Sequence, residues 1–236
     1  MGLRSALEAA GARRRRAAAL RFYRALVPPA GLCFDIGANV GERTDLFVAL
    51  GARVVAVEPQ ASCAAMLRRR FGGRIHLVEA ALGPAPGEAE LLVASYHTLS
   101  SLSPEWVEAV QESGRFADFA WDEREVVRMT TLDDLIREFG VPDFCKIDVE
   151  GYELEVVRGL SRPVPALAFE FTFERLDSRL AAVEHLASLG MTRFNFSYGE
   201  SLRFALDDWA GVDEMFRFLD STPRSIDTFG DVYAAQ

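Results

Sequence analysis

The sequence has few cysteines, no long apolar run and fewer basic than acidic residues. The three cysteines, Cys33, Cys63 and Cys145, leave one unpaired in any disulfide scheme and form no metal-ligand spacing, which favours a reducing compartment. No stretch approaches the ~20 apolar residues that span a bilayer, and the arginine-rich start lacks the apolar core of a signal peptide. We therefore expect a cytoplasmic protein with no membrane partner. The net charge of −9 repels phosphate backbones, so we do not expect nucleic acid as a partner.

The length and composition predict one folded domain. The chain has 236 residues, of which half are hydrophobic and a quarter are charged, the balance of an ordinary globular protein. Residues 1–30 read as an N-terminal helical extension that ends at Pro28 and Pro29. We assign residues 31–236 to a single domain, and the sequence leaves the oligomeric state open.

Short apolar runs alternate with helical patterns along most of the chain, which is typical of a parallel sheet with crossover helices. The expected strands of the regular part are residues 32–36, 53–58, 74–82, 143–148, 166–171, 192–197 and 230–235. This alternation of strands and helices is interrupted at about 85–130, where strands at 88–95 and 124–129 flank a helix at 104–113. We predict an α/β fold in which this insertion is a lid or shapes the substrate site.

A glycine-punctuated turn follows the first expected strand and precedes a helix. In the segment DIGANVG, Gly37 and Gly41 allow a tight turn and the close approach of a ligand to the backbone, while Asn39 hydrogen-bonds within the loop. Asp35 ends the strand before the loop, and Glu58 ends the next strand. A carboxylate at the position of Glu58 accepts the hydroxyls of an adenosine ribose. These residues predict an adenosine-containing cofactor.

The charge of the loop discriminates between cofactors. Dinucleotide sites use G-x-G-x-x-G, and here GANVG lacks the central glycine. Asp35 ahead of the loop repels a pyrophosphate but suits a ligand with an ammonium and a sulfonium group. We therefore expect S-adenosylmethionine rather than a nicotinamide or flavin cofactor.

Together with four further segments, these residues resemble the FkbM family of methyltransferases. The segments that carry the resemblance are FDIGANVGERT, VVAVEPQ, TTLDDL, KIDVEGYELEVVRGL and GDVY, within residues 32–235. The resemblance implies a Rossmann-like class I methyltransferase with a mainly parallel seven-stranded sheet and helices on both faces. It also implies methyl transfer, commonly to a hydroxyl oxygen of a sugar or secondary metabolite, so the expected partner is a small-molecule or glycan acceptor.

The resemblance also assigns cofactor-binding residues by position. It implies that S-adenosylmethionine is held by Asp35, Gly37, Asn39, Gly41, Glu58, Pro59, Ala81 and Leu82, the last two near the adenine.

Acidic residues follow the two strands expected beside the cofactor. Asp148 follows the strand at 143–148 and Glu170 lies near the end of the next, so both point toward the same edge of the sheet. Either a carboxylate with a pKa raised by burial acts as the base, or Asp148 and Glu170 hold a divalent cation that binds the acceptor oxygen. Glu150 belongs either to this site or to a helix N-terminus. His97, in the polar loop of the insertion, is a further candidate base.

Two alternatives to O-methylation stay open at this point. The cofactor half of the site does not specify the acceptor, so the same scaffold also suits an N- or protein methyltransferase. A non-catalytic module that binds the cofactor without turnover is the other alternative.

Overall fold

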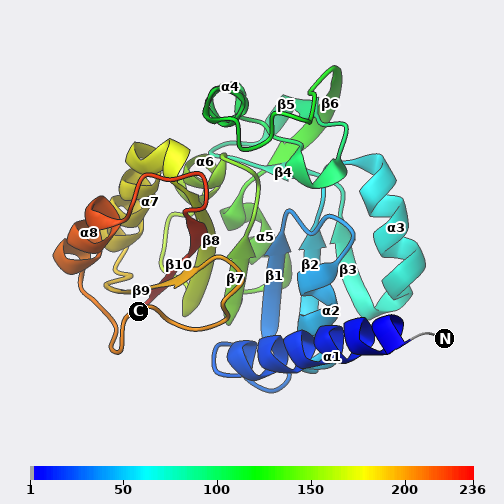
Figure 1. The fold of residues 1–236 in the computed structure, drawn as a ribbon, viewed down its shortest axis with the longest axis horizontal. Helices are drawn as coiled ribbons and strands as arrows, with labels where there is room; N and C mark the ends of the chain where they lie inside the picture. The colour runs from blue at the N-terminus through cyan, green and yellow to red at the C-terminus, as the bar shows by residue number, and fades with distance from the viewer. Residues whose placement is uncertain (1–2) are drawn as a thin grey trace.

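The computed structural model describes residues 3–236 and shows a three-layer α/β arrangement around a seven-stranded sheet (Figure 1). The strand order is β3-β2-β1-β7-β8-β10-β9, and every pairing is parallel except the two that β10 makes. The prediction of a mainly parallel seven-stranded sheet is therefore confirmed. The strands are β1 (Leu32–Ile36), β2 (Arg53–Val57), β3 (Ile75–Val78), β7 (Phe144–Ile147), β8 (Ala166–Thr172), β9 (Arg193–Tyr198) and β10 (Phe229–Ala235).

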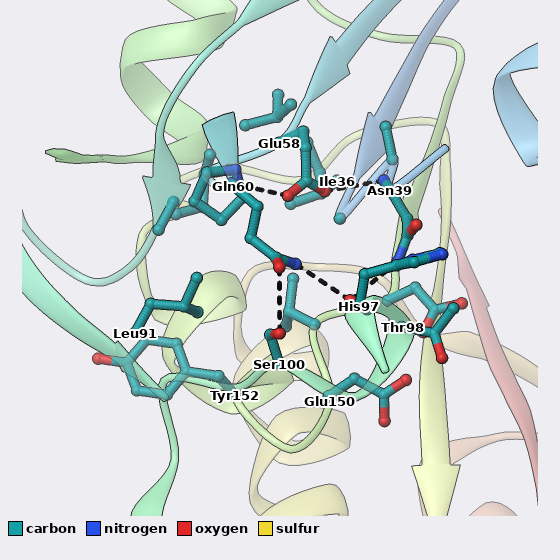
Figure 2. A pocket seen from close by; sticks show the side chains of 18 of the residues that line it. Ile36, Asn39, Glu58, Gln60, Leu91, His97, Thr98, Ser100, Glu150 and Tyr152 are labelled. Atoms are coloured by element: carbon teal, nitrogen blue, oxygen red, sulfur yellow. Dashed lines mark hydrogen bonds between the residues drawn. The ribbon is translucent and has the colours of Figure 1, made fainter. Parts of the chain in front are cut away.

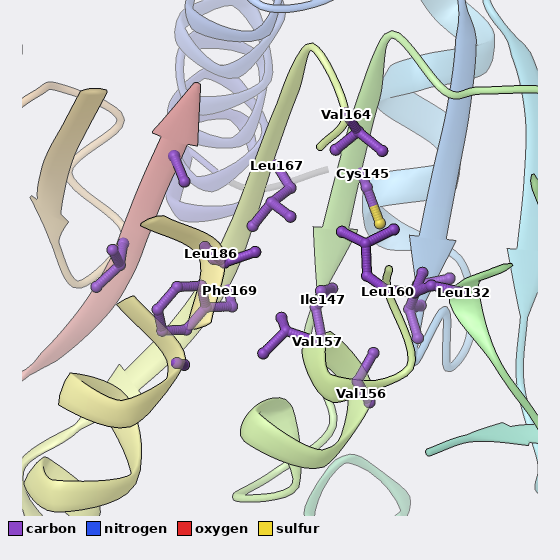
Figure 3. Close-up of a cluster of buried hydrophobic side chains, with 14 of the residues drawn as sticks. Leu132, Cys145, Ile147, Val156, Val157, Leu160, Val164, Leu167, Phe169 and Leu186 are labelled. Atoms are coloured by element: carbon purple, nitrogen blue, oxygen red, sulfur yellow. The ribbon is translucent and has the colours of Figure 1, made fainter. Parts of the chain in front are cut away.

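Helices cover both faces of this sheet because successive side chains of each strand point to opposite sides. In β1, Leu32, Phe34 and Ile36 join one buried apolar cluster and Cys33 joins the other. Figure 3 shows part of the first cluster, with Ile147 of β7 and Phe169 of β8. This cluster includes side chains of α5 (Leu132–Phe139), α6 (Glu153–Arg158), α7 (Leu176–Ser188) and α8 (Val212–Ser221). The opposite cluster includes side chains of α1 (Leu3–Tyr23), α2 (Glu42–Ala49) and α3 (Ala61–Phe71).

The predicted insertion forms a second, three-stranded sheet with the order β4-β6-β5, seen at the top of Figure 1 beside α4. Its elements are β4 (Ala81–Leu82), β5 (Gly87–Val93), α4 (Pro104–Ser113) and β6 (Glu123–Thr130). Helix α4 begins after Ser103, whose hydroxyl accepts a hydrogen bond from the Trp106 backbone amide at 3.1 Å. The prediction of one continuous strand at 74–82 is wrong at its end, because Ala81 and Leu82 pair with β6 instead of β2.

The N-terminal extension packs against the domain. Ala19, Tyr23 and Val27 are buried, and the Tyr23 ring contacts the rings of Phe47 in α2 and Phe144 in β7. Within the described residues, no helix combines the length and the apolarity that crossing a membrane requires.

Candidate active site

A cavity of about 480 Å³ opens where β1, β2 and β7 end, beneath the insertion. Figure 2 shows it from close by, with Glu58 on one side and His97, Ser100 and Glu150 across from it. Its walls come from the loops after β1, β2, β7 and β9, from β4 and β5, and from the insertion loop at 96–102. This volume is in the range of small-molecule sites.

The loop after β1 is held in one shape by its backbone. Gly37 has a φ of 78° and Asn39 a φ of 49°, both in the left-handed region. The amides of Gly37 and Ala38 both donate to the carbonyl of Val57 at 3.0 Å, which fixes the loop to the end of β2. A side chain at Gly37 would collide with the carbonyl oxygen of Asp148, so the loops after β1 and β7 touch only because a glycine is there.

Glu58 lies in the cavity wall and is 3% exposed. One carboxylate oxygen accepts the backbone amide of Asn39 and the other that of Gln60, each at 2.8 Å. Burial raises the pKa of Glu58 to about 7, although these two hydrogen bonds act in the opposite direction. The carboxylate is therefore fixed in orientation and available to the hydroxyls of a bound ribose.

Pro59, Ala81 and Leu82 also line the cavity, as do Gly37 and Asn39. With Leu91 of β5, Ala81 and Leu82 supply an apolar wall that suits the face of an adenine. Their contact with the adenine stays a prediction.

Two predicted cofactor residues, Asp35 and Gly41, are not among the residues that line the cavity, and their part in holding the cofactor stays a prediction. Asp35 is 2% exposed and accepts a hydrogen bond from the Thr44 hydroxyl at 2.5 Å, so it anchors α2 behind the loop. A side chain at Gly41 would collide with Leu67 and Phe71, so this glycine allows α3 to pack closely against the loop. Both residues shape the loop from outside the cavity.

Sequence reasoning missed Gln60, which connects the cofactor loop to the insertion. The Gln60 amide and the Asn39 amide donate to the carbonyl of His97, at 3.0 and 3.2 Å (Figure 2). The Ser100 hydroxyl donates to the Gln60 side-chain oxygen at 3.2 Å. The only signal was one polar side chain after the second strand, which is too common to be diagnostic.

Three carboxylates meet in one part of the cavity. Asp148, Glu150 and Glu170 each place an oxygen within 4.8 Å of the others. Glu150 has a φ of 52°, a strained conformation for a residue with a side chain, and lines the cavity. Burial and the neighbouring acids raise the pKa of both Glu150 and Glu170 well above the ordinary range. Glu150 therefore belongs to this cluster.

A buried lysine lies directly behind the cluster. Lys146 of β7 is 1% exposed, and its ammonium contacts a carboxylate oxygen of Asp148 at 3.0 Å and one of Asp231 at 3.1 Å. Asp231 belongs to the GDVY segment in β10, so this segment supplies one of the two ion-pair partners of Lys146. The ammonium compensates Asp148, while Glu150 and Glu170 have no such ion-pair partner among the described residues.

The insertion covers this side of the cavity. The ring nitrogen Nδ1 of His97 is buried without a hydrogen-bond partner in the described chain, and the residue lines the cavity. Arg115, just after α4, pairs with Glu174 at 2.7 Å and donates to the carbonyl of Thr228 at 3.2 Å, which connects the insertion to the turn after β8 and to the residue before β10. The predicted site residues Asp148, Glu170 and His97 thus share one cavity.

The sheet order, the glycine loop after β1 and the acid at the end of β2 define a Rossmann-like class I methyltransferase fold. A family model described as the methyltransferase FkbM domain matches residues 35–219. The chain belongs to this family and is an S-adenosylmethionine-dependent methyltransferase. Among curated proteins, a search finds no match.

Several solved structures are similar to the chain at low sequence identity. Precorrin-6y C5,15-methyltransferase from Geobacter metallireducens is 13% identical, with 94% of this chain and 87% of that chain covered and a TM-score of 0.49. A TehB-like SAM-dependent methyltransferase from Corynebacterium glutamicum is 10% identical over 99% and 98% of the chains, with a TM-score of 0.47. An O-methyltransferase from Bacillus cereus in complex with SAH is 11% identical over 95% and 81%, with a TM-score of 0.44.

Proposed function

We propose that the chain methylates a hydroxyl oxygen of a small molecule or glycan. The observation that carries this proposal is the cluster of Asp148, Glu150 and Glu170 in the same cavity as Glu58. A hydroxyl must lose its proton as the oxygen attacks the methyl group, so a base has to lie beside the acceptor. An ionised carboxylate whose pKa is raised by burial and by neighbouring acids meets this requirement, because it accepts a proton more readily than an exposed carboxylate.

The cofactor side of the cavity fits S-adenosylmethionine by its chemistry. Glu58 offers a fixed carboxylate for the ribose, and Ala81, Leu82 and Leu91 offer an apolar surface for the adenine. The acidic lining suits a ligand that carries two cationic groups. When bound, the cofactor supplies a methyl group on a positively charged sulfur.

Glu150 and Glu170 are the groups to which we assign the proton. Lys146 compensates the charge of Asp148, whereas two carboxylates close together favour sharing one proton. The acceptor hydroxyl gives its proton to the carboxylate of the pair that is still ionised, while its oxygen forms the bond to the methyl group and the sulfur of the cofactor leaves with the electrons of the broken bond. Asp148 orients the acceptor through a hydrogen bond. His97, across the cavity, is the second candidate base.

The cluster also offers the oxygen ligands that a divalent cation prefers. In that case the cation would lower the pKa of the acceptor hydroxyl and the carboxylates would be its ligands. We favour the direct base because Lys146 already supplies a positive charge to the cluster. We therefore expect turnover to persist within about twofold after dialysis against a chelator, and a loss that Mg²⁺ or Mn²⁺ restores would establish the metal-dependent route instead.

The acidic cavity also favours a cationic acceptor, and this keeps amine methylation as the second candidate. O-methylation and amine methylation are distinguished by incubating the enzyme with methyl-labelled cofactor and a panel of hydroxylated sugars, other small alcohols and matched amines. We expect the label in an ether, identified by its methyl carbon shift in nuclear magnetic resonance. Label confined to amine products would overturn the assignment of the acceptor atom and leave the cofactor site intact.

A further inference from the structure

One arginine lies in the otherwise acidic cavity. Arg43 is the second residue of α2, directly after the cofactor loop, and its side chain is 22% exposed. It is the sole Lys or Arg among the described residues that line the cavity. The acidic lining residues are Glu42, Glu58, Asp148, Glu150, Glu170 and Glu200. An anionic group of any ligand in this cavity therefore has one cationic partner.

The existing contact of Arg43 is incomplete. Its Nη2 donates to both carboxylate oxygens of Glu200, at 2.8 and 2.9 Å. Its Nε is buried and has no acceptor in the described chain. A guanidinium binds a carboxylate most strongly through two adjacent N–H groups, and Glu200 engages only one nitrogen. The Nε–H group of the guanidinium is therefore left as a donor for a second carboxylate that reaches Nε and Nη2 together.

Glu200 is easily displaced. It lies in the turn after β9, is 66% exposed and also lines the cavity. An exposed ion pair contributes little to stability, because water replaces the partner of each charge at low cost. A ligand carboxylate that reaches Nε and Nη2 together would replace it.

We propose that Arg43 binds the carboxylate of the methionine half of S-adenosylmethionine and that Glu200 occupies Arg43 until the cofactor enters. This inference rests on the proposed placement of the cofactor in this cavity. The acidic lining suits the sulfonium and ammonium of the cofactor, whereas Arg43 is the one cationic lining side chain for its carboxylate among the described residues. Arg43 lies in the first turn of α2, directly after the loop that contains Asn39, so the segment that is placed against Glu58 leads into the carboxylate-binding group.

The test compares two ligands that share the adenosine and the sulfur. S-adenosylhomocysteine carries the amino-acid carboxylate, and 5′-deoxy-5′-methylthioadenosine lacks it. By calorimetric titration, we expect Arg43→Gln to weaken S-adenosylhomocysteine about 10- to 100-fold, because a charge-assisted hydrogen bond is lost. Binding of methylthioadenosine should change less than about twofold, since the variant removes nothing that this ligand contacts.

Glu200→Gln tests whether Glu200 competes with the carboxylate of the cofactor for Arg43. Without the rival carboxylate, S-adenosylhomocysteine should bind about 2- to 5-fold more tightly, and methylthioadenosine should be unaffected. The matched control is Arg124→Gln, which breaks the exposed pair of Arg124 with Glu90 on the insertion outside the cavity lining. It should leave both affinities unchanged.

Three outcomes would overturn the proposal: unchanged affinity of S-adenosylhomocysteine in Arg43→Gln, equal weakening of both ligands in that variant, or weaker binding in Glu200→Gln. Equal weakening would mean that Arg43 only supports the loop. Failure of both ligands to bind the unaltered protein would instead contradict the cofactor site itself, which keeps the two failures distinct.

Discussion

Glu58→Gln is expected to weaken binding of S-adenosylhomocysteine about 100-fold, because two hydrogen bonds from the ribose to a charged acceptor are lost or weakened. Glutamine keeps the size of the side chain but offers one acceptor oxygen where the backbone amides of Asn39 and Gln60 already require two. Titration calorimetry measures the change. Glu79→Gln is the matched control, since Glu79 follows the next strand, outside the cavity lining, and pairs with Arg68.

The raised pKa of Glu58, about 7 in the free protein, adds a pH dependence to this prediction. The anion is the form that accepts both hydroxyls, so affinity should rise as pH increases from about 6 to 8, and Glu58→Gln should lose most of that slope. The effect on folding has the opposite sign. The folded protein holds this proton more tightly than the unfolded chain, so stability is lost as pH rises from 4.5 through about 7. A variant with an unchanged pH slope and affinity would contradict the assigned role.

Removing the two carboxylates to which we assign the proton, Glu150 and Glu170, should have the largest effect on turnover. For the double variant Glu150→Gln and Glu170→Gln, we expect a fall of about 100- to 10,000-fold in kcat, because neither amide accepts the acceptor proton. Affinity for S-adenosylhomocysteine should stay within about threefold. Single-turnover kinetics with labelled cofactor measures the first quantity and calorimetry the second.

The control for the double variant is Glu184→Gln, an exposed acid on α7 that is not part of the cavity lining. If the double variant retains its turnover, the carboxylate pair is not the base. His97→Gln then becomes the decisive variant, because the buried Nδ1 of His97 is the remaining candidate proton acceptor.

The order of strands and helices could be predicted because each apolar run alternates with a helical pattern of suitable length. Helix α8 was not predicted, although its apolar residues Val212, Met215, Phe216 and Leu219 have the spacing of one helix face and pack against the core. Strand β4 escaped as well. Its two residues join β6, some 48 positions later in the chain (Ala81 pairs with Met129), and no local pattern encodes such a pairing.

The candidate site was predictable where residues follow strand ends. Glu58 and Asp148 directly follow parallel strands and Glu170 lies near the end of β8, so the sheet topology brings them to the same edge. The pair of Arg43 with Glu200 joins residues 157 positions apart through a turn whose shape the sequence does not reveal. Asp35 and Gly41 have the residue type of a ligand contact, but in the structure the first contacts α2 and the second lies against α3, and neither lines the cavity.

Strand β10 lies between β8 and β9, although β9 precedes it in the chain. During synthesis, β9 therefore emerges before the strand that attaches it to the sheet. Its backbone N–H and C=O groups have no strand partner until Phe229–Ala235 has been made. Asp231, which pairs with the Lys146 ammonium, arrives with the same segment. A ribosome-bound chain that stops short of β10 therefore has an unpaired sheet edge, and its Lys146 keeps Asp148 but lacks Asp231 as an ion-pair partner. An unpaired edge of this kind is prone to pair with other chains.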